Sequence, residues 1–149
     1  MDVMRVVATL LATAALAGCG AAASRPRDPT SGPPDAYVRT ATGRHLLARS
    51  SFCWPGEDRR LCADSGAPRC DDGVTPTIRV QRGERVRFEL GFDPTEVGLT
   101  FFAPHRVSGG ERLAASRRPA WDVDRQGALS LFARAIGRDA SYVGCIAFE

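Results

Sequence analysis

The sequence predicts an all-β domain, an antiparallel β-sandwich, over residues 36–149. Short runs of β-branched, aromatic and aliphatic residues alternate with turn signals at intervals of roughly 8 to 12 residues. In the clearest runs, apolar and charged side chains alternate with a period of two, which indicates strands with one buried face. No long stretch follows the helical period of about 3.6 residues.

The expected strands follow one another along the chain with turn residues between them. Gly43 and the run Pro55-Gly56-Glu57-Asp58 supply the first turns. The segment 111–116 has the weakest pattern and also fits one turn of helix. The expected strands cover residues 36–40, 45–54, 60–63, 77–80, 85–91, 99–103, 111–116, 128–136 and 141–148.

Two of these segment pairs are expected to form antiparallel hairpins. Segments 77–80 and 85–91 are joined by Gln81-Arg82-Gly83-Glu84, and their apolar positions alternate with charged ones. Segments 128–136 and 141–148 are joined by Gly137-Arg138-Asp139-Ala140. The last strand is apolar enough to be tied into a sheet rather than frayed. The number of strands and the domain length match an immunoglobulin-like sandwich.

Residues 1–18 are expected to be a signal peptide. Arg5 precedes an uncharged, mostly aliphatic run that is too short to span a bilayer, which needs about 20 residues. The run ends in Leu16-Ala17-Gly18-Cys19, which resembles the lipobox of bacterial lipoproteins. The resemblance implies cleavage before Cys19 and lipidation of its sulfur. Acyl chains then anchor the protein to a membrane, at about 0.8 kcal/mol per buried methylene.

Residues 19–35 are expected to be a disordered tether between the lipid and the domain. The segment is rich in Pro, Ala, Gly and Ser and shows no apolar period. As a coil it reaches on the order of 20 to 25 Å. The predicted organisation is therefore a signal peptide (1–18), a lipidated cysteine with its tether (19–35) and a sandwich domain (36–149).

The composition excludes several function classes. The net charge is +3, and all 20 basic residues are Arg. Without Lys the chain has no Schiff-base lysine, no Ser–Lys dyad and no P-loop lysine. The basic excess is too small for a dedicated nucleic-acid binder, so no nucleic-acid partner is expected. No G-x-S-x-G motif occurs, and the sequence indicates no catalytic residue.

Four cysteines besides Cys19 are expected to form two disulfides, because an exported domain lies in an oxidising compartment. Cys53 and Cys62 flank the turn at 55–58, so a hairpin places them close together. This favours the pairs Cys53–Cys62 and Cys70–Cys145 over the alternative Cys62–Cys70 and Cys53–Cys145. The spacing shows neither a C-x-x-C redox pair nor close zinc-ligand pairs.

Several short motifs resemble a family of uncharacterised bacterial surface lipoproteins. The motifs are Ser51-Phe52-Cys53-Trp54, then Leu61-Cys62-Ala63-Asp64, then a valine-rich segment with Gly83-Glu84 at its turn. The resemblance implies a β-sandwich and supports pairing Cys53 with Cys62. It implies no activity and no catalytic residue. Cys70 and Cys145 are additions to the simpler pattern of the family.

Three residues are candidates for binding. Trp121 follows Arg117-Arg118-Pro119-Ala120 in an expected loop, where an indole beside arginines can stack on a sugar or contact a partner protein. The competing interpretation is that Trp121 packs in the core. Trp54 adjoins Cys53, and a tryptophan packed against a disulfide is typical of immunoglobulin cores.

Metal sites are weaker hypotheses. His45, His105 and Cys145 could supply a copper site, but no methionine remains after signal cleavage to act as axial ligand. The run 122–127 begins like a calcium loop but has Ala133 where the bidentate Glu should stand. The acidic residues Asp64, Asp71 and Asp72 could form a patch beside the cysteines. No metal or cofactor is expected.

The sequence therefore predicts a lipid-anchored binding or structural module on the extracytoplasmic face of the cell membrane. Its expected partners are the membrane, through the lipid anchor, and an envelope protein or carbohydrate. The alternative is a small envelope metalloprotein or redox protein that uses the acidic loop or the cysteines.

Overall fold

The computed structural model describes residues 32–104 and 106–149, which form eleven strands and two sheets. The expected signal peptide (1–18) and Cys19 lie outside the described residues, as does most of the tether. The strands are β1 (Tyr37–Thr40), β2 (Gly43–Leu46), β3 (Ala48–Pro55), β4 (Arg60–Ala63), β5 (Thr77–Val80), β6 (Arg85–Glu89), β7 (Glu96–Ala103), β8 (Arg106–Leu113), β9 (Ala120–Asp122), β10 (Gly127–Ala135) and β11 (Arg138–Phe148).

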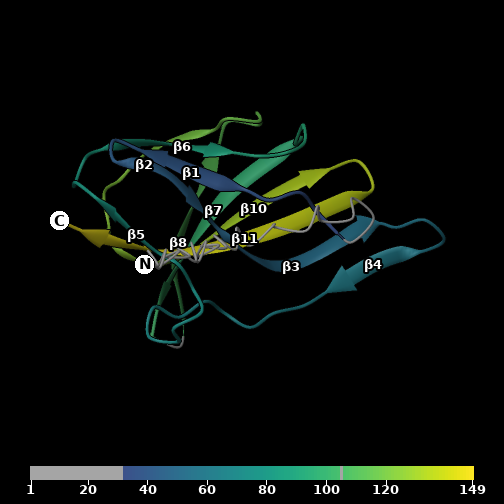
Figure 1. Cartoon of the computed structure of the whole chain (residues 1–149), viewed down its shortest axis with the longest axis horizontal. Coiled ribbons are helices and arrows are strands. Elements are labelled where there is room, and N and C mark those ends of the chain that lie inside the picture. Colours follow the sequence, from purple (N-terminus) through teal and green to yellow (C-terminus); the bar gives the residue numbers. More distant parts are fainter. Residues whose placement is uncertain (1–31, 105) are drawn as a thin grey trace, which may run out of the picture.

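The two sheets pack face to face, which confirms the predicted all-β sandwich (Figure 1). Sheet A has four strands in the order β2-β1-β6-β9. Sheet B has seven strands: six run in the order β4-β3-β11-β10-β7-β8, and β5 also pairs with β11. Every pairing is antiparallel except β5 with β11, which is parallel.

The core lies between the inner faces of the sheets and follows from the period of two. In sheet A, Val38 and Phe88 lie opposite each other and are 0% and 1% exposed. In sheet B, Leu99, Leu131 and Tyr142 form one row across β7, β10 and β11, each no more than 2% exposed. Burial of such side chains stabilises a fold by about 1.5–3 kcal/mol each. The alternation predicted from the sequence therefore identifies the buried faces.

The predicted hairpin of segments 77–80 and 85–91 is wrong, although both strands form. β5 pairs with β11 in sheet B, and β6 pairs with β1 and β9 in sheet A. The connection between them crosses from one sheet to the other, with Gly83 at φ +82° and its N–H donating to the Val123 carbonyl at 2.7 Å. Both strands bury one face in the same core. Their alternation of apolar and charged side chains is therefore the same whether they pair as a hairpin or lie in different sheets.

Two other expected elements also change. The expected strand 45–54 is divided at Leu47, which is 2% exposed and whose N–H donates to the Ala36 carbonyl at 3.0 Å. The chain passes here from β2 in sheet A to β3 in sheet B. Segment 111–116 is no helical turn: residues 111–113 are the end of the edge strand β8, and residues 114–116 follow it as loop. The expected strands 60–63 and 77–80 are confirmed to the residue.

Both disulfides have the pairing that the hairpin argument favours. Cys53 and Cys62 lie directly opposite each other on β3 and β4, with their Cα atoms 4.1 Å apart. Cys70 is joined to Cys145 of β11, with their Cα atoms 5.6 Å apart and a sequence separation of 75. The second disulfide fixes a long loop to the centre of sheet B.

The chain enters the domain through a buried polar contact. The Tyr142 hydroxyl, on the inner face of β11, donates to the Pro34 carbonyl oxygen at 2.8 Å. Burial raises the pKa of this hydroxyl, so it remains a donor. The guanidinium of Arg49 lies 3.0 Å from the carboxylate of Asp35. These contacts fix the segment that leads into β1.

Candidate functional site

The outer face of sheet B carries a row of small and apolar side chains. Phe102, Ala128 and Cys145 lie directly opposite one another on β7, β10 and β11. Residues adjacent in sequence point to opposite faces of a sheet. Since the neighbours Phe101 and Leu129 lie in the core, this row points away from it. An uncovered row of this kind would leave apolar surface in water.

The loop between β4 and β5 covers one end of this row. Its disulfide from Cys70 reaches Cys145, and the Cys145 N–H donates to the Pro76 carbonyl at 2.8 Å. As a result Cys145 is 2% exposed and Ala128 7% exposed, although both lie on the outer face. We call residues 64–76 the stapled loop.

Asp72 gives the stapled loop its turn. Its carboxylate accepts the N–H groups of Val74 and Thr75, each at 2.8 Å, and the Thr75 hydroxyl at 2.9 Å. The hydrogen bonds from Thr75 and Val74 hold the pKa of Asp72 below its usual value. Asp72 is thereby an internal turn residue, as is common for Asp.

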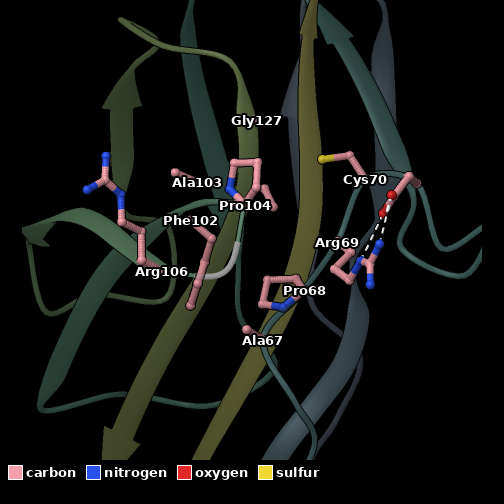
Figure 2. Close-up of a pocket in the computed structure, with 11 residues that line it drawn as sticks. Ala67, Pro68, Arg69, Cys70, Phe102, Ala103, Pro104, Arg106 and Gly127 are labelled. Atoms are coloured by element: carbon pink, nitrogen blue, oxygen red, sulfur yellow. Dashed lines mark hydrogen bonds and ion pairs between the residues drawn. The ribbon is translucent and has the colours of Figure 1, made fainter.

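A pocket of about 520 Å³ lies between the stapled loop and the ends of β7, β8 and β10 (Figure 2). Most of its lining is apolar. The loop side contributes Ala67 and Pro68, and the sheet side contributes Phe102, Ala103, Pro104 and Ala128. Its volume is within the range of small-molecule sites, about 300–1,000 Å³.

The charged residues of the pocket lie on its two sides. Figure 2 shows Arg69 on one side, beyond Pro68, and Arg106 on the other side beside Phe102. Arg69 donates to both oxygens of Asp71, at 3.0 and 2.8 Å, which raises the pKa of Arg69 and lowers that of Asp71. Arg106 has no carboxylate partner in residues 32–104 and 106–149.

The pocket therefore combines an apolar lining with one uncompensated cation. Such a site suits a ligand with an apolar body and a single anionic group. Nothing in the sequence pattern singled out Phe102 or Arg106. Two signals pointed to this region: the expected disulfide from Cys70 to Cys145, which brings residues near Cys70 onto the final strand, and the expected acidic patch, which includes the lining residue Asp71.

The three predicted binding residues lie elsewhere and do not form one site. Trp121 is on β9, 2% exposed, with its ring centroid 5.4 Å from that of Phe101 in the core. The prediction that Trp121 is a surface binding residue is thus corrected, because its indole face is not accessible. Its Nε1 has no hydrogen-bond partner among the described residues.

Arg117 and Arg118 are both exposed, but only Arg117 lines a pocket. Arg117 donates to both oxygens of Asp93 at 2.6 and 2.7 Å, which raises the pKa of Arg117 and lowers that of Asp93. This pair borders a second hollow of about 440 Å³, together with Ile136 and Arg138. Arg118 lies beside it in the chain and does not line either pocket.

Trp54 packs inside the core rather than against the Cys53–Cys62 disulfide. Its ring lies edge-on to Phe92, with the centroids 5.0 Å apart. Trp54 and Cys53 are neighbours on β3 and therefore point to opposite faces of sheet B.

The candidate metal ligands are engaged in other contacts. Cys145 is in a disulfide, and His45 is hydrogen-bonded to Thr40 at 3.1 Å, while His105 lies outside the described residues. Asp64 accepts a hydrogen bond from Ser51 at 2.8 Å. Across the described part of the chain, no three His, Cys, Asp or Glu side chains gather as a metal site would require.

The expected calcium run is held by arginines instead. Asp122 accepts two hydrogen bonds from Arg85 at 2.9 Å, and Asp124 accepts from Arg125 at 2.8 and 2.6 Å. Gly127 follows with φ +119° and opens β10. The run is therefore the connection from β9 to β10.

Comparisons of the chain with protein-family models, with curated proteins and with solved structures gave no match. In the ranges 32–104 and 106–149, no helix is long and apolar enough to cross a membrane.

Proposed function

We propose that this protein is a lipid-anchored binding module on the extracytoplasmic face of the bacterial cell membrane. The ligand occupies the pocket under the stapled loop. The observation that carries the proposal is that pocket, about 520 Å³ in volume, which a disulfide holds open against the outer face of sheet B. Two disulfides support an oxidising location, and the lipobox-like run at Cys19 supports an anchor.

The ligand class follows from the lining of the pocket. Pro68, Phe102 and Pro104 offer apolar surface and no side-chain hydrogen-bonding group. A free sugar would place most of its hydroxyl groups against apolar lining, because hydrogen-bonding side chains lie only at the two sides of the pocket, at Arg69, Asp71 and Arg106; this is unfavourable. An aromatic or aliphatic carboxylate, sulfonate or phosphate leaves its apolar part in the pocket and its anion beside Arg106. We therefore propose a small amphipathic anion as the ligand.

Binding of 1-anilinonaphthalene-8-sulfonate tests this proposal, because the dye has apolar rings and one sulfonate. The mature chain with Cys19→Ser is titrated with the dye by fluorescence and by calorimetry. We expect one saturable site. Arg106→Gln should weaken binding about tenfold, which corresponds to a charge-assisted hydrogen bond in a partly exposed site. Ala67→Trp, on the exposed side of the pocket, should reduce binding by filling the space.

Arg112→Gln is the matched control, because Arg112 lies on the same strand and its side chain is 84% exposed outside the pocket. It removes the same charge and should leave the affinity unchanged. Equal losses for the Arg106 and Arg112 variants would contradict a defined anion position. Binding that is indifferent to Ala67→Trp would contradict the pocket itself.

The anchor is tested separately by growth of expressing bacteria with labelled palmitate. The intact chain should incorporate the label into the membrane fraction, and Cys19→Ser should not. Label in the Cys19→Ser variant, or none in the intact chain, would contradict lipidation at Cys19.

A further inference from the structure

Three arginines form a row across the outer face of sheet A. Arg39 on β1 lies directly opposite Arg44 on β2 and directly opposite Arg87 on β6. Their neighbours Val38 and Phe88 are buried in the core, so the three side chains point outward. All three residues are exposed. We call these residues the arginine row.

The arginine row is only partly neutralised within the domain. Glu89 accepts from Nε of Arg44 at 2.6 Å and from Nε of Arg39 at 3.0 Å. The hydrogen bonds from Arg44 and Arg39 hold the pKa of Glu89 below its usual value. Arg87 has no carboxylate partner among the described residues. One carboxylate thus faces three cations, and like charges opposite each other destabilise a sheet.

Amphipathic side chains border the arginine row. Tyr37 lies directly opposite both Leu46 and Glu89 on the same outer face. Leu46 is 44% exposed, and the guanidinium carbon of Arg44 lies 3.3 Å from the centroid of the Tyr37 ring. Leu46 is exposed and Tyr37 is half-buried under Arg44. Leu and Tyr beside arginines are residue types found at the level of lipid headgroups.

The proposed anchor keeps the whole domain near the membrane. β1 is the first strand after the tether, and its first residue, Tyr37, follows Cys19 by only 18 positions in the sequence. Pro34 and Asp35 are held on the domain, and a Cβ on Gly32 would meet the ring of Phe52 on β3. A lipidated Cys19 therefore keeps the domain as a whole near the bilayer, and the charge of the arginine row determines which face meets the headgroups. The short distance to the bilayer gives weak headgroup contacts a high effective concentration.

From these observations we propose that the outer face of sheet A docks on anionic phospholipid headgroups of the membrane that holds the anchor. The membrane part of this inference depends on the proposed lipidation of Cys19. The pocket lies on the outer face of sheet B. Sheets A and B form the two opposite layers of the sandwich (Figure 1). Docking through sheet A therefore leaves the pocket open to solvent.

The test uses the full mature chain with Cys19→Ser, so that any membrane binding comes from the protein surface and not from lipid. The chain is sedimented with vesicles of phosphatidylcholine alone and with vesicles of equimolar phosphatidylcholine and phosphatidylglycerol. We expect binding only to the anionic vesicles, and we expect it to weaken as salt is added. Each arginine near an anionic surface contributes roughly a fivefold gain in affinity.

The triple variant R39Q/R44Q/R87Q should reduce vesicle binding at least tenfold. R59Q/R79Q/R112Q is the matched control, because it removes the same charge from exposed positions of sheet B and its hairpins. The control should retain most of the binding. Arg87→Gln alone breaks no ion pair and should still weaken binding several-fold. It therefore tests the proposal even if the triple variant does not fold.

The outcomes separate this proposal from the proposed anchor. Failure of the wild-type surface to bind anionic vesicles overturns the docking face, even if palmitate labelling succeeds. Equal losses in the triple variant and its control also overturn it, because they would show a general charge effect. Vesicle binding that depends on the arginine row, without palmitate labelling, would support the face and reject only the anchor.

Discussion

The two disulfides are expected to contribute unequally to the stability of the domain. The perturbation is Cys70→Ala/Cys145→Ala in one variant and Cys53→Ala/Cys62→Ala in the other. Alanine is chosen because Cys145 is 2% exposed and a serine hydroxyl there would lack water. The two covalent loops do not overlap in sequence, since one closes 53–62 and the other 70–145. Their effects on the unfolded chain should therefore add.

The magnitudes follow from the loop lengths. The sequence separations are 75 residues for Cys70–Cys145 and 9 residues for Cys53–Cys62. With these lengths the chain-entropy relation gives about 4.5 and about 2.6 kcal/mol of stabilisation, respectively. The difference of about 1.9 kcal/mol depends only on the ratio of the loop lengths. For a domain of this size it corresponds to roughly 6 to 8 °C in Tm.

Urea unfolding followed by tryptophan fluorescence measures the difference, because Trp54 and Trp121 are both buried. We expect the Cys70/Cys145 variant to unfold at the lower urea concentration. If the Cys53/Cys62 variant loses as much stability or more, the loop-length argument is refuted. A loss confined to dye binding, with unfolding unchanged, would instead show that Cys70–Cys145 holds only the pocket.

Three further outcomes are expected. Tyr142→Phe removes the hydrogen bond to the Pro34 carbonyl and should lower the free energy of unfolding by about 1–2 kcal/mol, so unchanged urea unfolding would speak against that contact. Glu89→Gln should lower Tm near neutral pH. Hydrogen bonds from the arginine row lower the folded pKa of Glu89, so its stabilisation is present above the unfolded value of 4.5 and disappears as pH falls through the folded pKa; a Tm difference that persists in strong acid would contradict this. Gly83→Ala should destabilise by about 1 kcal/mol in thermal melts, because φ is +82°, and an equal Tm would argue against this turn.

The alternation of apolar and polar side chains predicted well which residues form strands. It predicted less well which strands pair with each other. The expected segment 77–80 matches β5 to the residue, yet its predicted partner, β6, lies in the other sheet. Alternation shows which face of a strand is buried, and both sheets of a sandwich bury their faces in one core. Nothing local distinguishes a hairpin turn from a crossing between sheets at 81–84. The parallel pairing of β5 with β11 joins residues 68 positions apart in the sequence.

The pocket was harder to predict because its walls come from distant segments. Pro68 lies on the stapled loop, and Phe102 lies near the end of β7. Cysteine pairing predicted that Cys70 reaches the final strand, but it did not predict which side of sheet B the loop covers. The run Arg117-Arg118-Pro119-Ala120 before Trp121 predicts a loop, but Trp121 lies on β9, a strand of only three residues. The competing prediction, that Trp121 packs in the core, is confirmed by its burial on the core side of sheet A.

The most direct test of the proposed function is to map the dye onto the folded, oxidised protein by NMR. Amide chemical shifts of the mature chain with Cys19→Ser are followed as 1-anilinonaphthalene-8-sulfonate is added. We expect the largest changes around the pocket, at Cys70, Phe102, Arg106 and Ala128. Changes centred instead on the second hollow near Ile136, or spread evenly over both sheets, would contradict a binding site under the stapled loop.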